Sequence, residues 1–159
     1  NGKKHGKAKE YNRENILIFE GEYFNGKKNG KCKECESIYN NLTKKLLYYI
    51  CFEGEYLNGQ RNGKGKEYED NDNILFEGEY LNGKRYNGYG IEKYKETIIF
   101  EGEYLNGRYW NGQLFDSEIK NGEGYIDEYN KRGKLIYEGE YKDGLKNGKE
   151  KKTTIIQCS

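Results

Sequence analysis

The chain has no proline, methionine or valine, and it has one histidine and one tryptophan among its 159 residues. Leu, Ile and Phe supply 30 residues, about 19% of the chain, just below the ~20% at which disorder is suspected. Disordered chains, however, usually combine a large net charge with few aromatics. Here 28 basic residues nearly balance 27 acidic ones, and 17 residues are tyrosine. We therefore predict a folded chain whose interior is built largely from tyrosine.

Other absences narrow the class of protein. No apolar run approaches the ~18 residues of a membrane-spanning helix, and the first residues contain no signal-peptide core. The balanced charge speaks against nucleic acid as a partner, because binding it needs a dense basic face. The chain lacks an initiator Met and opens with a copy of the later 25–30 segment. We therefore expect a piece of a longer repeat array, with residues 1–159 forming one array.

A pentapeptide recurs along the whole chain. Phe19-Glu20-Gly21-Glu22-Tyr23 is repeated at 52–56, 76–80 and 100–104, with a close variant at 137–141 and a degenerate copy at 115–122. The starts are separated by 33, 24, 24, 15 and 22 residues. The underlying period is therefore 24 residues, with one insertion before Phe52 and one deletion before Phe115.

Each unit is predicted to form a β-hairpin. In the unit that ends at Gly83, a first strand covers 63–68, a turn rich in Asp and Asn covers 69–73, and a second strand covers 74–81. Asn82-Gly83 then turns the chain toward the next unit. We expect at least ten strands in hairpins that follow chain order, with helix nearly absent.

Alternation along the second strand separates two faces. Phe76, Gly78 and Tyr80 share one face, while Glu77 and Glu79 share the other. We expect an aromatic ring from the neighbouring unit to fill the space beside each Gly, so that the units share an aromatic spine. The Glu pairs face the Lys-rich first strands, which predicts cross-strand charge pairs on a solvated face.

These residues resemble a known repeat family. The run 76–85, with Asn87-Gly88-Tyr89-Gly90 after it, is similar to the MORN (membrane occupation and recognition nexus) repeat, and the likeness extends over essentially the whole chain. The resemblance implies an all-β fold of tandem antiparallel hairpins in an elongated, twisted, single-layer sheet. The chain departs from the usual pattern by placing Tyr where Trp is common and by its 24-residue spacing, which resembles a variant subclass.

Catalytic chemistry finds little support. His5 lies in a terminal turn, where a solvated residue is the ordinary interpretation. The repeated Glu pairs lack the enclosing cleft that a glycosidase needs, and no glycine motif is completed into a nucleotide site. We therefore predict no enzyme activity and no cofactor.

The four cysteines support neither a metal site nor a definite compartment. Cys32 and Cys35 have CxxC spacing, but the only others are Cys51 and Cys158, so a four-ligand zinc site is disfavoured. Cys32 occupies the position that Gly65 holds in the next unit. The insertion at 36–50 should lengthen its hairpin or form a loop, and alignment places Cys35 roughly opposite Cys51. We expect a cytoplasmic protein with reduced thiols, with cytoskeletal or membrane association left open.

Protein binding is the preferred function. The resemblance implies a spacer, a dimerising rod or a docking groove for a partner helix or extended peptide, and a homo-oligomer is compatible with it. The candidate partner-binding residues are aromatic, because interfaces are enriched in such residues: Tyr23, Tyr56, Tyr80, Tyr104, Tyr109, Trp110 and Tyr141.

Two alternatives stay open. The first is attachment to anionic phospholipid through basic turn residues, namely Lys27, Lys28, Lys84 and Arg85. The second is an accessory role beside an enzyme domain outside this chain. Trp110 precedes the shortened unit, where we expect a narrower sheet. It is either an exposed anchor for a partner or a plug that fills the gap.

Overall fold

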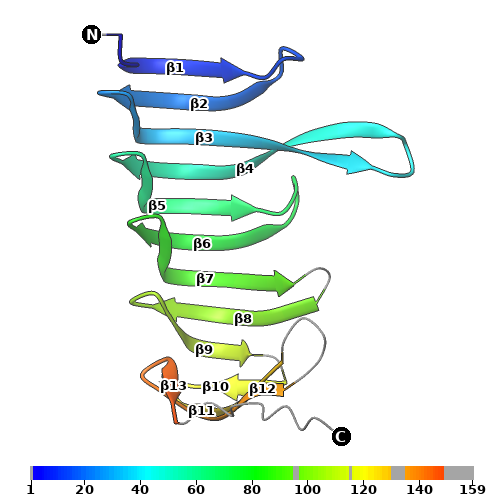
Figure 1. Cartoon of the computed structure of the whole chain (residues 1–159), viewed down its shortest axis with the longest axis vertical. Coiled ribbons are helices and arrows are strands. Elements are labelled where there is room, and N and C mark those ends of the chain that lie inside the picture. Colours follow the sequence, from blue (N-terminus) through cyan, green and yellow to red (C-terminus); the bar gives the residue numbers. More distant parts are fainter. Residues whose placement is uncertain (1, 95–96, 115, 130–134, 149–159) are drawn as a thin grey trace, which may run out of the picture. The chain divides into compact units, whose positions relative to one another are not determined.

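The computed structural model describes residues 2–94, 97–114, 116–129 and 135–148, and all regular secondary structure in these ranges is β-strand (Figure 1). The strands form antiparallel hairpins in chain order, which confirms the all-β repeat architecture and the expected number of strands. Within these ranges no helix is long and apolar enough to span a membrane.

The chain divides into two compact units, Asn1–Gly88 and Tyr89–Ser159. In the first unit, each strand is hydrogen-bonded to the next along the chain in an open sheet. Its strands are β1 (Gly6–Tyr11), β2 (Leu17–Phe24), β3 (Lys27–Asn40), β4 (Lys45–Leu57), β5 (Gln60–Tyr68), β6 (Ile74–Leu81) and the beginning of β7 (Lys84–Tyr94).

The second unit contains the remainder of β7 and six further strands. β8, β9 and β10 pair in chain order, and β11, β12 and β13 form a three-stranded sheet. Their bounds are β8 (Thr97–Leu105), β9 (Arg108–Leu114), β10 (Ser117–Ile119), β11 (Gly124–Tyr129), β12 (Leu135–Lys142) and β13 (Leu145–Asn147).

Asn-Gly turns join successive hairpins, as the sequence predicted. Asn82 and Gly83 have φ values of 51° and 82°, the left-handed conformation that a two-residue hairpin turn requires at both central positions. The degenerate unit, the fifth of six along the chain, keeps this turn, since Asn121 and Gly122 have φ values of 52° and 74°. Its second strand, β10, has only three residues, so the sheet narrows here as expected. Phe115 lies outside the described residues.

The core lies on the face of the sheet that carries the repeated aromatics. Phe52, Phe76 and Phe100 are fully buried, and the tyrosine four residues after each is at most 7% exposed. Within each strand the two rings meet edge to face, and Phe52 also meets Tyr80 of the next hairpin at 5.3 Å between centroids. Ile119 replaces tyrosine in the degenerate unit and is 1% exposed.

The sequence predicted that a ring of the neighbouring unit fills the space beside each repeated glycine, and this holds at one of two such glycines, Gly65 and Gly78. A Cβ on Gly65 would lie 2.8 Å from Phe52 Cζ and 3.2 Å from Tyr80 Cε2, so rings of two hairpins do cover this residue. The expectation was wrong at Gly78. There a Cβ would lie 2.9 Å from Phe76 Cζ of the same strand and 2.2 Å from the Asn87 carbonyl oxygen, because adjacent backbone already fills the space.

The insertion at 36–50 lengthens one hairpin, which confirms the first of its two predicted outcomes. β3 and β4 have 14 and 13 residues and extend past the edge of the sheet (Figure 1). Cys35 pairs with Ile50 rather than Cys51, because an irregularity after Glu34 shifts the register by one residue. Cys35 and Cys51 are both free thiols, and burial raises the pKa of Cys51 to about 11.

Candidate functional site

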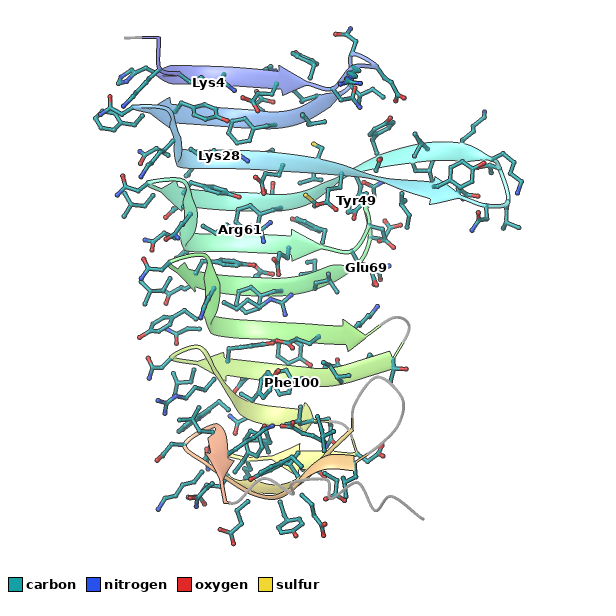
Figure 2. All side chains as sticks on the ribbon, in the orientation of Figure 1. Lys4, Lys28, Tyr49, Arg61, Glu69 and Phe100 are labelled. Carbon is teal, nitrogen blue, oxygen red and sulfur yellow. The ribbon has the colours of Figure 1, made fainter. Side chains whose placement is uncertain are left out.

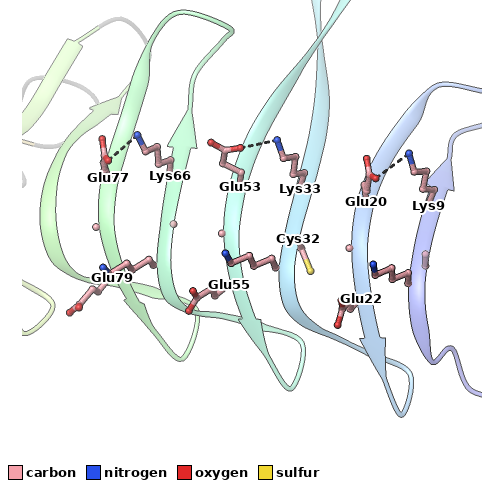
Figure 3. A pocket seen from close by; sticks show the side chains of 18 residues that line it. Lys9, Glu20, Glu22, Cys32, Lys33, Glu53, Glu55, Lys66, Glu77 and Glu79 are labelled. Carbon is pink, nitrogen blue, oxygen red and sulfur yellow. Dashed lines mark ion pairs between the residues drawn. The ribbon is translucent and has the colours of Figure 1, made fainter.

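An open trough of about 910 Å³ lies on the face of the first unit opposite the aromatic core. It crosses all the strands from β1 to β6 (Figure 3). Three parallel lines of residues form it, with one residue from each strand in each line. One line makes the floor, and the two lines beside it make the walls.

The floor consists of residues with little or no side chain. It runs through Ala8, Gly21, Cys32, Gly54, Gly65 and Gly78. At Gly54 a Cβ would lie 2.7 Å from Phe52 Cζ and 2.7 Å from the Lys64 carbonyl oxygen, because the core rings press against this line from the other side. The same packing that requires glycine in the core therefore leaves the trough floored by main chain.

The walls carry lysine and glutamate in strict alternation from strand to strand. One wall contains Lys9, Glu20, Lys33, Glu53, Lys66 and Glu77, and the other contains Lys7, Glu22, Lys31, Glu55, Lys64 and Glu79. Six lysines thus balance six glutamates. The predicted cross-strand charge pairing is confirmed by ion pairs of 3.0 Å for Lys9 with Glu20, 3.1 Å for Lys33 with Glu53 and 2.9 Å for Lys66 with Glu77.

These pairs are exposed, so they contribute little to stability. The side chains of Lys33 and Glu53 are 54% and 35% exposed, and pairs of this kind typically contribute ~0–1 kcal/mol. A hydrogen bond of 2.8 Å from the Tyr68 hydroxyl, together with Lys33, lowers the pKa of Glu53. Glu53 therefore stays charged at neutral pH, and the exposed side chains of this pair remain available to a ligand.

The structure places the candidate partner-binding tyrosines in the core, where their ring faces are covered. Tyr23, Tyr56, Tyr80, Tyr104 and Tyr141 are 3–8% exposed. Several of their hydroxyls donate to a glutamate on the preceding strand, as Tyr104 does to Glu92 at 2.6 Å. Burial raises the pKa of the hydroxyls of Tyr23, Tyr56, Tyr80 and Tyr141. Their role in binding a partner stays a prediction, and their visible role is packing.

A ladder of cations covers the same core and was missed in the sequence. Each cation lies five positions after the last tyrosine of a pentapeptide, on the next strand. Its side chain packs over the first aromatic ring of the same pentapeptide. The distances from the cation to the ring centroid are 4.5 Å for Lys28 over Phe19, 3.9 Å for Arg61 over Phe52, 5.0 Å for Arg85 over Phe76 and 4.8 Å for Lys146 over Tyr137. The signal was the constant five-residue offset.

The four candidate lipid-binding residues fall into two groups. Lys28 pairs with Glu34 and Arg85 pairs with Glu67, and both side chains lie mostly inside the aromatic face. Lys27 and Lys84 are exposed beside the Asn-Gly turns. Lys28 and Arg85 therefore hold the sheet together, and only Lys27 and Lys84 are presented to solvent.

The ladder is interrupted at Tyr109, which takes the place of a cation. Its ring stacks on Phe100 at 4.1 Å between centroids, and its hydroxyl donates to Glu92 at 2.9 Å. Trp110 is half-buried against the turn at Gly122, whose N–H donates to the Trp110 carbonyl oxygen at 2.7 Å. This position fits the plug more closely than the exposed anchor.

Chemistry-bearing side chains are scattered over the described residues. His5 is exposed, with its ring 5.2 Å from that of Phe24. Cys32 is buried in the trough floor, and burial raises its pKa. No group of three or more His, Cys, Asp or Glu side chains in the described part of the chain is arranged to hold a metal ion.

Comparison with known proteins agrees with this architecture. The family model described as the MORN repeat matches residues 19–35, 52–72, 76–96 and 137–149. Each matched region begins at the first aromatic residue of a repeated pentapeptide. No curated protein matches the chain.

Proposed function

Since the chain belongs to the MORN repeat family, we propose that it is a non-catalytic scaffold whose trough in the first unit binds an extended segment of a partner protein. The observation that carries this proposal is the trough itself. It is long, open and floored by main chain, and both of its walls carry charges that the fold leaves exposed.

The dimensions favour an extended segment over a helix. Six strands spaced ~4.8 Å apart give a trough about 24 Å long, which accommodates about seven residues of extended chain. The wall residues on one strand are two positions apart, or ~6.8 Å along the strand. A helix with its side chains is ~10–12 Å wide, so it would rest on the walls without reaching the floor.

The walls also define the chemistry of the partner. Because lysine and glutamate alternate at every strand, a uniformly acidic or basic peptide meets a like charge at every second strand. A segment that carries both signs can pair with each wall. The floor offers main chain, so small or apolar residues of the partner should face it.

Selection from a displayed library of random heptapeptides tests this proposal. We expect enriched peptides of mixed charge that bind the purified chain. Exchanging the charges in Lys33→Glu/Glu53→Lys should weaken their binding at least tenfold, because the ion pair is kept while the order of charges in one wall is reversed.

The matched control is Glu101→Lys on β8 in the second unit, a strand position equivalent to Glu53 and outside the trough. It should leave peptide affinity unchanged. Peptides that bind the exchanged variant as tightly as the native chain, or a library that yields no binders, would overturn the proposal. Circular dichroism of each variant confirms that the sheet is retained.

A further inference from the structure

The inserted part of the long hairpin, residues 36–50, forms an arm that projects from the edge of the sheet in the first unit (Figure 1). Five cross-strand pairs, from Glu36 with Tyr49 to Asn40 with Lys45, lie within it. Figure 2 shows Tyr49 at the base of the arm, where it leaves the sheet. The arm belongs to one hairpin only, so it is a feature of this chain and not of the repeat.

Both faces of the arm are apolar and exposed. Paired residues share a face, so Ile38 with Leu47 marks one face and Tyr39 with Leu46 marks the other. These four side chains are 45–51% exposed. Leu42 at the tip is 94% exposed, which is the highest value among the exposed large hydrophobic residues of the described chain. Apolar surface of this extent on a folded chain marks an interaction site.

The tip has a defined conformation. The Asn40 side-chain oxygen accepts hydrogen bonds from the backbone N–H groups of Leu42 at 3.0 Å and Thr43 at 2.9 Å. Lys44 adopts a left-handed φ of 57°, which completes the turn. Leu42 is therefore held outward by the turn itself, and binding does not have to order the tip.

The arm is also basic. Lys44 and Lys45 lie just after Leu42, and the one acidic residue of the arm, Glu36, is at its base. Both lysines are exposed, and no carboxylate of the described residues pairs with either of them. The tip thus combines an exposed leucine with two free positive charges, while the whole chain has a net charge of only +1.

From this arrangement we propose that the arm inserts its tip into the headgroup region of an anionic phospholipid membrane. Leu42 enters deepest, Lys44 and Lys45 lie at the level of the phosphates, and Tyr39 lies at the interface, where tyrosine is enriched. From Glu36 to Asn40 the strand advances about 14 Å, which exceeds the ~5–10 Å depth of interfacial insertion. The remaining sheet can stay outside the membrane.

The distribution of side chains favours a membrane over a protein partner. A flat protein surface or a second copy of the arm packed against it would cover one face of the ribbon and leave the other exposed. A lipid interface surrounds both faces and the tip together. Two arms brought side by side would also place Lys44 and Lys45 of each copy close to one another, which opposes self-association.

Sedimentation with phospholipid vesicles tests the proposal. The native chain should bind vesicles of phosphatidylserine and phosphatidylcholine but not vesicles of phosphatidylcholine alone, and added salt should weaken the binding. Leu42→Ala should reduce vesicle affinity about tenfold, because it removes apolar side chain from the inserted tip. Lys44→Gln/Lys45→Gln should reduce it about thirtyfold, from ~1 kcal/mol for each lysine.

Two matched controls lie outside the arm. Leu81→Ala removes a leucine that is 44% exposed on β6 and should leave vesicle binding unchanged. Lys27→Gln/Lys84→Gln removes two exposed turn lysines and should have a smaller effect than the change at Lys44 and Lys45. Circular dichroism establishes that every variant keeps its strand content.

A second readout locates the tip directly. The Leu42→Trp variant adds a tryptophan at the tip, and the spectrum of the native chain, which contains only Trp110, is subtracted from its spectrum. The remaining emission should shift to shorter wavelength with anionic vesicles and should be quenched by brominated acyl chains. Unchanged vesicle binding by both Leu42→Ala and Lys44→Gln/Lys45→Gln would overturn the proposal. So would dependence on Lys27 and Lys84 alone, or a dimer in sedimentation that Leu42→Ala dissociates while vesicles bind no protein.

Discussion

Replacing Arg61 by alanine should destabilise the first unit by about 3 kcal/mol, because this side chain joins two hairpins. Its guanidinium carbon lies 3.9 Å from the centroid of the Phe52 ring. It pairs with Glu34 at 3.3 Å and also with Glu67, and its Nε donates to the Tyr56 hydroxyl at 3.3 Å. The side chain is only 24% exposed, so water screens these contacts incompletely.

The magnitude follows from the separate contributions. A partly desolvated cation over a ring contributes up to ~2 kcal/mol, and hydrogen bonds to charged groups contribute ~1.5–3 kcal/mol. Ordering a long side chain costs up to ~2 kcal/mol, which the alanine variant recovers. Glu34 keeps Lys28 and Glu67 keeps Arg85, so neither carboxylate is left without a cation. The expected net loss is therefore about 3 kcal/mol.

Arg61→Lys separates charge from geometry. Lys28 occupies the equivalent position in the preceding hairpin, with its Nζ 4.5 Å from the Phe19 ring centroid, so lysine is accepted there. The variant keeps the charge and loses the planar fork of donors, and the expected loss is about 1 kcal/mol. Arg108→Ala is the control, because Arg108 is exposed and, among the described residues, donates only to the Asp143 carbonyl oxygen, at 3.1 Å.

Urea denaturation followed by circular dichroism measures each free energy of unfolding, and hydrogen exchange locates the loss. Protection should fall in β3 to β6 and persist in the second unit, because repeat hairpins contact mainly their neighbours. A loss below about 0.5 kcal/mol for Arg61→Ala, no larger than that for Arg108→Ala, would refute a structural role for the cation ladder.

Three further changes probe other parts of the core. The free energy of unfolding should fall as the pH rises above ~10. Tyrosines of the unfolded chain ionise there, whereas burial raises the pKa of Tyr56 and Tyr141 in the folded chain. Each such tyrosine lowers the free energy of unfolding by ~1.4 kcal/mol per pH unit. A urea midpoint that stays constant from neutral pH to about pH 11 would contradict this. Gly54→Ala should cost at least ~3 kcal/mol of stability in the same assay, because its Cβ would meet backbone and ring atoms at 2.7 Å. In the control Gly83→Ala, the Cβ meets nothing nearer than 4.0 Å, so the cost should be only the ~1–2 kcal/mol of a left-handed φ. Equal losses would argue against a close approach of atoms at the trough floor. Trp110→Ala should cost ~2–3 kcal/mol, less than a fully buried tryptophan, and an unchanged melting temperature would favour the exposed anchor over the plug.

The fold could be predicted from sequence because its determinants are local. Two-residue alternation assigned Phe76 and Tyr80 to one face and Glu77 and Glu79 to the other, and the structure shows that division. Asn-Gly pairs set the hairpin turns, because asparagine and glycine tolerate the required backbone conformation. The same pattern predicted the charge pairs, of which Lys66 with Glu77 is one.

The site was harder to predict, because it depends on register across strands. Arg61 follows an Asn-Gly turn and looks like a solvated turn residue, but the antiparallel register returns it beside Tyr56 and over the core. Cys51 missed its predicted partner by one residue because β-bulges leave no clear local signal. The trough was missed as well, since alternation describes each strand separately and a floor appears only when the glycines of several strands align.

Comparison of the two units separates positions that the fold needs from positions that it leaves free. Gly102 and Gly112 of the second unit keep the close backbone approach of the floor glycines, so glycine is required in both units. The lysines are not kept. Glu101 and Glu103 on β8 face Gln113 and Asn111 on β9, where the first unit places lysine opposite glutamate.

A neutral amide can therefore replace lysine opposite glutamate without loss of the sheet. Asn111, for example, donates a hydrogen bond of 2.6 Å to Glu103. Exposed lysine–glutamate pairs add only ~0–1 kcal/mol to stability, so folding alone gives little reason for the six lysines that line the trough. Their alternation with glutamate over six consecutive strands is better explained by a ligand that spans those strands than by the stability of the sheet.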